Sequence, residues 1–129
     1  MTRLDLLRRR HISGGGTTDF GTSNMTTFTS TADVPTTSAS KYLQQTCKHW
    51  AHNLEVSFTA EQGSIIFPKD ARGANHPGDG VVTFSASHAS LGVRIEASCE
   101  AQLEGLKGAV ARHVDRFAFR EAPLEYVWK

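Results

Sequence analysis

Six segments of the chain have the composition, or the alternation of apolar and polar residues, that predicts β-strands. The first, residues 28–34, is rich in threonine, and β-branched residues suit a half-buried strand. Along residues 54–58, 91–97 and 124–128 every second residue is apolar, so one face of each strand can lie on a core while the other faces water. The two remaining predicted strands cover residues 64–67 and 81–86.

Two longer segments repeat apolar residues at every third or fourth position, which predicts amphipathic helices. The first covers residues 39–52. In the second, Ser98 is placed to cap the helix, and Glu100 in its first turn offsets the helix dipole. Gly105 and Gly108 each weaken this helix by about 1 kcal/mol relative to alanine. The first apolar stripe is Ala39, Leu43, Cys47, Trp50 and Leu54, and the second is Leu103, Leu106, Val110, Val114 and Phe117.

The predicted elements follow the order strand, helix, four strands, helix and a final strand. Strands joined by short turns pair antiparallel, and the two helical stripes have only the apolar face of that sheet to cover. The sequence therefore predicts a two-layer α+β fold, in which two helices cover one face of an antiparallel sheet. The order is that of the TATA-binding-protein-like or helix-grip class, an analogy that gives shape and no function.

Residues 25–129 are predicted to form this single domain, because the chain is long enough for one core and too short for two ordinary ones. Residues 1–24 are predicted to be a disordered tail or leader, since their arginine-, glycine- and serine-rich composition buries too little apolar area to offset the entropy of ordering. Residues 69–80 have turn chemistry and exceed an ordinary hairpin loop in length, so this segment is either mobile or functional, and we favour the mobile alternative.

Composition narrows the class of protein. The net charge of +1 lacks the basic excess that nucleic-acid binding needs. No run approaches a membrane span, and the basic start is not followed by the apolar stretch of a signal peptide. Two cysteines, Cys47 and Cys99, form neither a CxxC pair nor a disulfide framework, which leaves a single bridge between them as the alternative to two free thiols. We therefore expect a cytoplasmic protein that binds neither nucleic acid nor a membrane.

The densest chemistry lies at residues 47–52, with the sequence CKHWAH on one predicted helix. On an ideal helix with Leu43 set at zero, Cys47 falls at about 40°, whereas His49 and His52 fall at about 240° and 180°. Cys47 cannot join both histidines on one metal ion, because metal ligands must converge. We interpret Cys47 as a small buried apolar residue.

His49, His52 and His113 form the candidate metal site, for zinc or iron. His49 and His52 lie three residues apart, a looser version of the pair that helical zinc sites use, and His113 borders the stripe of the second helix. An alternative without a metal explains the positions of all three histidines. In that alternative His52 is exposed at the helix end, while His49 and His113 are hydrogen-bonded residues at the border of the core.

The chain contains no GxSxG, HExxH or glycine-rich phosphate loop, so the sequence gives little support for an enzyme. Arg116 and Arg120 flank Phe117 and Phe119 and could hold an anionic ligand by bidentate contacts. Capping of the helix end explains these arginines equally well.

Residues 40–52 (SKYLQQTCKHWAH), residues 113–124 (HVDRFAFREAPL) and Trp128 resemble the bacterial domain-of-unknown-function family 2218, over residues 29–128. The resemblance implies a small bacterial domain, sometimes found beside or fused to siderophore-handling proteins, and it transfers no catalytic residue. The 69–80 segment is longer than is usual in that family, and this departure argues against a ligand role for His76.

Two hypotheses follow. The first is a non-enzymatic binding or accessory domain with a cleft for a small molecule, linked to iron handling or to a siderophore-related protein partner. The cleft would be lined or bordered by Tyr42, His49, Trp50, His113 and Arg116. The second is a metal-dependent enzyme or metal carrier that uses the three candidate histidines.

Overall fold

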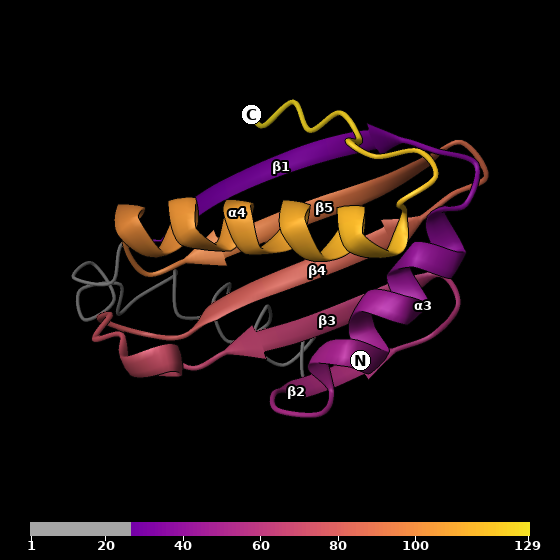
Figure 1. Ribbon diagram of the computed structural model, residues 1–129. Coiled ribbons are helices and arrows are strands. Elements are labelled where there is room, and N and C mark those ends of the chain that lie inside the picture. The colour runs from indigo at the N-terminus through magenta and orange to yellow at the C-terminus, as the bar shows by residue number, and fades with distance from the viewer. Residues whose placement is uncertain (1–26) are drawn as a thin grey trace, which may run out of the picture.

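The computed structural model describes residues 27–129, so the predicted tail, residues 1–24, lies outside the described part. A five-stranded antiparallel sheet with the order β1-β5-β4-β3-β2 forms one layer (Figure 1). The four strands predicted between the helices are present, and they follow one another as a meander. The strands are β1 (Phe28–Pro35), β2 (Glu55–Phe58), β3 (Gln62–Phe67), β4 (Gly80–Ala86) and β5 (Ser90–Ala97).

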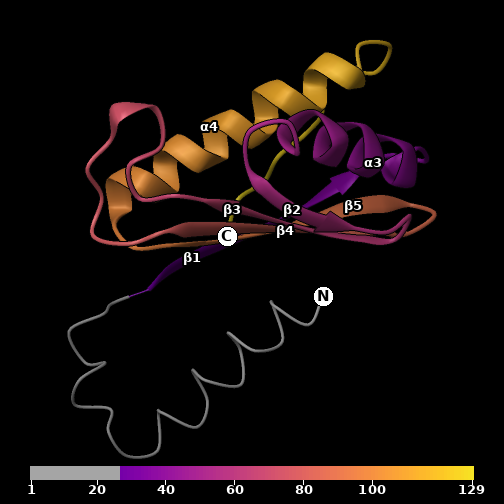
Figure 2. The ribbon, with the colours of Figure 1, turned by 90° about the horizontal axis from the view of Figure 1, so that it is seen from below.

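Two helices form the second layer. Helix α3 (Ala39–Trp50) follows β1, helix α4 (Glu100–Phe117) follows β5, and a short 3-10 helix, η1 (Ala71–Gly73), lies between β3 and β4. Figure 2 shows both long helices on the same face of the sheet. The predicted two-layer α+β architecture is therefore confirmed.

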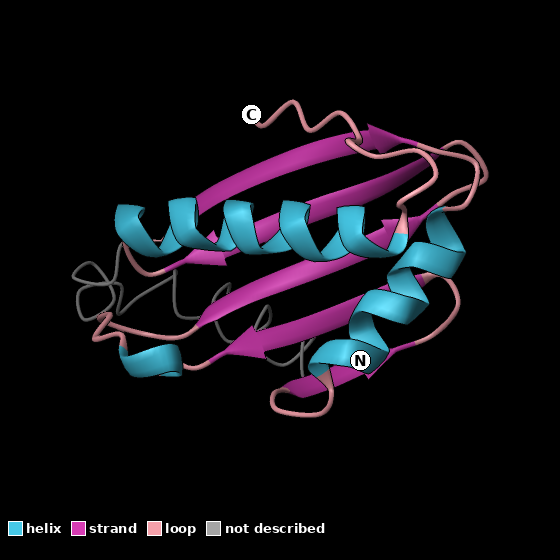
Figure 3. Ribbon diagram, in the orientation of Figure 1, coloured by secondary structure: helices cyan, strands magenta, loops and turns pink. Residues whose placement is uncertain are grey.

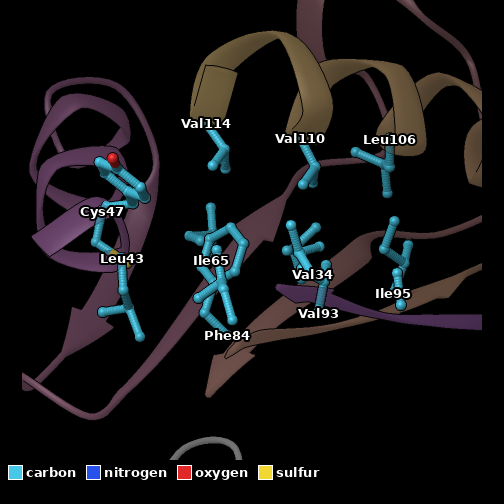
Figure 4. Packing of buried hydrophobic residues seen from close by; sticks show 14 of the residues in the cluster. Val34, Leu43, Cys47, Ile65, Phe84, Val93, Ile95, Leu106, Val110 and Val114 are labelled. Atoms are coloured by element: carbon cyan, nitrogen blue, oxygen red, sulfur yellow. The ribbon is translucent and has the colours of Figure 1, made fainter. Parts of the chain in front are cut away.

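The alternation in the sequence separates the two faces of the sheet. Asp33 of β1 pairs with Gly92, and Thr31 pairs with exposed Arg94, so these positions make a polar outer face. The inner face meets Leu106, Val110 and Val114 of α4 together with residues of α3 (Figure 4). The largest sheet side chains in this core are Val34, Ile65, Val82, Phe84, Leu91 and Ile95, all fully buried.

The predicted final strand over residues 124–128 is wrong. This segment runs beside β1 as a loop (Figure 3), and only Lys129 makes ladder-like contacts, by reciprocal backbone hydrogen bonds with Thr31 (2.8 and 3.2 Å). Tyr126 turns instead toward α4, where its hydroxyl donates to Asp115 (3.1 Å). The alternation reflects side chains that pack on the core without strand pairing, namely Leu124, Tyr126 and Trp128.

The start of α4 also differs from the prediction, because Cys99 and not Ser98 is the N-cap residue. Ser98 donates its backbone N–H to the Oε1 of buried Gln102 (2.6 Å). Ser98 Oγ and Gln102 Nε2 both donate to the carbonyl oxygen of Gly78, each at 3.0 Å. These bonds tie the segment before β4 to the first turn of α4.

Within residues 27–129, no helix has both the length and the apolar character needed to cross a membrane.

Candidate functional site

A pocket lies on the helical side of the sheet, between the end of α3, the first four turns of α4 and the segment after β3. Figure 2 shows this segment, which contains η1, rising from the sheet to the level of the helices. The pocket volume is about 510 Å³, within the range of small-molecule sites, roughly 300–1,000 Å³. Its apolar lining includes Trp50, Leu54, Phe67, Pro68, Leu106 and Ala109. Its polar lining includes Asp70, Arg72, His76, Gln102, Arg112 and His113. We call it the α3–α4 pocket.

Aromatic rings form one wall of the α3–α4 pocket. Trp50 stands edge-on to Phe67, with ring centroids 5.1 Å apart and planes at 84°. Its other neighbour is His113, with centroids 4.6 Å apart. Because Trp50 is only 6% exposed, these contacts hold its ring in place.

The α4 wall contains a glycine that packing does not require. A Cβ at Gly105 would meet no heavy atom within 4 Å, and Gly105 lines the α3–α4 pocket. Gly80 gives the contrast, because a Cβ there would lie 2.7 Å from Leu106 Cδ1. Glycine inside a helix costs about 1 kcal/mol relative to alanine. At Gly105 this cost is offset by no contact in the protein, and the backbone of α4 is left bare toward the pocket.

Two guanidinium groups lie at the α3–α4 pocket. Arg72 belongs to η1 and has a left-handed backbone (φ 58°, ψ 33°), which is uncommon for a residue with a side chain. Arg112 of α4 lies along its own helix, and a Cβ at Gly108 would come within 2.9 Å of its Nη1. Within residues 27–129 neither arginine forms a salt bridge. Asp70 is the carboxylate among the lining residues.

His113 is held in one tautomer. Its Nδ1 donates to the carbonyl oxygen of Ala109 (2.7 Å), because a carbonyl can only accept. Burial lowers the pKa of His113 from its ordinary value of 6.5, and the nearby His49, Arg72 and Arg112 lower it further, while the bond to Ala109 opposes the shift. At neutral pH the ring is therefore uncharged, and Nε2 carries a free lone pair.

The structure brings together three of the predicted site residues. His49 lies beside His113, with ring centroids 5.3 Å apart, and Trp50 contacts His113 from the same helix end. Trp50 and His113 line the α3–α4 pocket, whereas His49 stands behind them, near Phe117.

His52 does not join the other two histidines. It is exposed beyond the end of α3 and does not line the α3–α4 pocket. Within residues 27–129 no group of three or more His, Cys, Asp or Glu side chains could hold a metal ion. Cys47 is fully buried, as the helical geometry indicated, and burial raises the pKa of its thiol to about 12.

Tyr42 and Arg116 do not line the predicted cleft. The Tyr42 hydroxyl donates to the carboxylate of Glu121, and Thr36 Oγ1 donates to the same carboxylate (3.1 Å). The bond to Glu121, followed by burial, raises the pKa of Tyr42. Tyr42 therefore fastens the segment after α4 to α3, and Arg116 is exposed outside the α3–α4 pocket.

Sequence reasoning missed Arg72, Gly105 and Arg112. Gly105, Ala109 and Arg112 follow a spacing of four and three residues, which puts them on one helical face, so this part of the site had a readable signal. Arg72 had none, because its place depends on how the segment after β3 folds back toward α4.

Comparison with known proteins identifies the family. The family model described as "Uncharacterized protein conserved in bacteria (DUF2218)" matches residues 31–129. The chain belongs to this family. It is also similar to the solved protein described as the NMR structure of PA4090 from Pseudomonas aeruginosa, with 31% sequence identity and a TM-score of 0.61. That similarity covers 79% of this chain and 95% of the other. The search of curated proteins gave no match.

Proposed function

We propose that this DUF2218 chain is a non-enzymatic small-molecule-binding domain and that the α3–α4 pocket is its binding site. The observation that carries the proposal is the bare wall at Gly105, a helical glycine without a packing partner within 4 Å beside a pocket of about 510 Å³. Glycine is favoured where a ligand approaches the backbone closely. Apolar walls with a few convergent polar groups are typical of binding sites for small molecules.

The two alternative themes from the sequence have less support. Structural zinc sites have four ligands and catalytic sites three protein ligands, whereas only His49 and His113 of the candidate histidines lie together. A link to iron or siderophores, implied by the family resemblance, gains no support from the described residues or from the comparisons. The proposal therefore contains neither theme.

A cytoplasmic setting remains part of the proposal. Its support is that Cys47 and Cys99 are both free, as is usual in a reducing compartment.

The test is to titrate the protein with a set of small aromatic acids and alcohols and to map the backbone amide shifts by NMR. We expect shifts that cluster at Leu54, Gly105 and Ala109. Gly105→Leu places a side chain on the bare wall of the α3–α4 pocket and should weaken binding strongly. The matched control is Ala101→Leu, at an exposed position one turn earlier in α4 and outside the pocket lining, which should bind as the wild type does.

Shifts elsewhere, or no shifts at millimolar concentrations, would contradict the proposal. A separate measurement addresses the metal alternative. If Zn²⁺ or Fe²⁺ at one hundred times its dissociation constant bound only the folded state, it would add about 2.7 kcal/mol to the free energy of unfolding. A rise of that size that disappears in His113→Gln would favour the metal alternative over our proposal.

A further inference from the structure

We infer that the ligand of the α3–α4 pocket is a small planar carboxylate, with its carboxylate between Arg72 and Arg112 and its ring on the bare backbone at Gly105. This inference rests on the proposed function and adds the chemical class of the ligand. It depends on three observations: the charge of the lining, the position of Arg112 and the shape of the walls.

The charge of the lining favours a monoanion. Arg72 and Arg112 are always protonated, Asp70 is the one carboxylate among the lining residues, and His113 is neutral at pH 7. One positive charge is left without a partner in the pocket. Guanidinium groups match the planar, two-oxygen geometry of a carboxylate, which each can contact through two N–H groups. Both arginines are exposed, so salt should weaken the attraction.

The position of Arg112 depends on a second glycine. Its guanidinium passes over Gly108, where a Cβ would stand 2.9 Å from Nη1, and helical side chains are directed toward the helix N-terminus in this way. The guanidinium is thereby brought back toward the turn that contains Gly105. Gly105 thus leaves room for the ring of the ligand, and Gly108 leaves room for the Arg112 guanidinium that contacts its carboxylate.

The walls favour a flat ring. Trp50 and Phe67 form a fixed edge-to-face pair on one side, and the Gly105 backbone offers a surface without a side chain on the other. A flat ring can contact both surfaces, and aromatic contacts of this kind contribute beyond the area that they bury.

Protonation of His113 should change the affinity of the pocket for a carboxylate. His113 faces His49 and Trp50 from α3, Arg112 and Ala109 from α4, and Arg72 from η1. Below its pKa, His113 adds a positive charge to the α3–α4 pocket. The affinity for a carboxylate should therefore rise as the pH falls through the pKa of His113, as long as the carboxylic acid, of ordinary pKa near ~4, is still ionised.

The experiment compares four probes that share one ring: 2-naphthoate, 2-naphthylmethanol, 2-naphthylmethylammonium and 2-naphthyl phosphate. Binding is measured by calorimetry and by the amide shifts of Gly105 and Ala109. We expect 2-naphthoate to bind most tightly and the ammonium probe least tightly. Arg112→Gln should lower the affinity for 2-naphthoate about tenfold, the effect of one charge-assisted contact of about 1.4 kcal/mol, and should leave 2-naphthylmethanol unaffected.

Four variants sharpen the result. Arg116→Gln removes the same charge from the same helix outside the α3–α4 pocket and should leave the affinity within about twofold, since exposed charges act weakly at a distance. Gly108→Ala should displace the Arg112 guanidinium and weaken 2-naphthoate binding, but have no effect in an Arg112→Gln background. His113→Gln should reduce the rise in affinity at low pH, and His76→Gln is the matched variant, because His76 also lines the pocket.

The outcomes separate this inference from the proposed function. Equal binding of 2-naphthoate and 2-naphthylmethanol at Gly105 would overturn the carboxylate and keep the binding site. Tighter binding of the phosphate or ammonium probe would also overturn the carboxylate. If no probe shifts Gly105 or Ala109, both the inference and the proposed function fail.

Discussion

Two glycines, Gly63 in β3 and Gly105 in α4, show how two regions of this protein differ: the packed contact between the sheet and α3, here called the closed region, and the α3–α4 pocket, here called the open region. Gly63 of β3 lies under α3, where a Cβ would stand 2.7 Å from Cys47 Sγ, so the glycine is needed for the sheet and helix to touch. Gly105 of α4 lies at the α3–α4 pocket, where a Cβ would meet nothing within 4 Å. The glycine at position 63 is required by packing within the folded protein, whereas the exposed glycine at position 105 is not, and our proposal explains it by the approach of a ligand.

The largest expected effect comes from a substitution in the closed region. Gly63→Ala should lower the free energy of unfolding by about 1–3 kcal/mol, because overpacking of a fully buried contact forces the helix or the sheet to shift. Urea unfolding measures the change. Gly92→Ala on β5 is the matched control, since its Cβ would lie 3.5 Å from Ser85 O, an ordinary contact. Equal effects of the two substitutions would contradict the account of the closed region.

Tyr42→Phe tests the hydrogen bond that holds the segment after α4 against α3. Loss of the hydroxyl that donates to Glu121 should cost about 0.5–1.5 kcal/mol, the ordinary contribution of one hydrogen bond. Thermal and urea unfolding give the value. In a Glu121→Gln background the cost should shrink, whereas a full cost there would mean that Tyr42 acts by packing alone.

Gly105→Ala should act in the opposite direction to Gly63→Ala. It should raise the free energy of unfolding by up to about 1 kcal/mol, because alanine favours the helix and its Cβ enters empty space. The same substitution should weaken binding of 2-naphthoate. Stabilisation is read from the urea midpoint at an unchanged slope. A variant that is more stable and binds equally well would leave Gly105 without a functional explanation.

The smallest expected effect concerns His113. Its pKa in the folded protein lies below the ordinary 6.5, so the unfolded chain takes up a proton first as the pH falls. The free energy of unfolding should therefore drop as the pH falls below about 6.5 and go on dropping down to the folded pKa. His113→Gln should flatten this part of the curve, while a substitution of exposed His88 should not. A wild-type curve that rises toward low pH would contradict the assignment.

The sequence predicted most of the fold and only part of the candidate site. The strands followed from local properties, namely alternation in β2 and β5 and β-branched composition in β1, and the approach of Trp50 to His113 followed from two helices that cover one face. The prediction that Arg116 borders the cleft was wrong, because the end of α4 lies away from the α3–α4 pocket. The segment after α4 instead reaches α3 through the bond between Glu121 and Tyr42. Arg72 depends on a left-handed backbone in a long connection, which no periodic pattern reveals.

The irregular segment over residues 124–129 has a consequence for how copies of this protein meet one another. β1 is an edge of the sheet, and an edge strand presents unpaired backbone groups on which another chain can extend the sheet. Lys129 occupies both the N–H and the carbonyl oxygen of Thr31, and its own carbonyl also accepts from Ser30 Oγ (2.8 Å). The other edge, β2, has four residues. One edge is thus occupied at Thr31 by the chain itself and the other is short, and both features oppose the addition of a strand from another molecule.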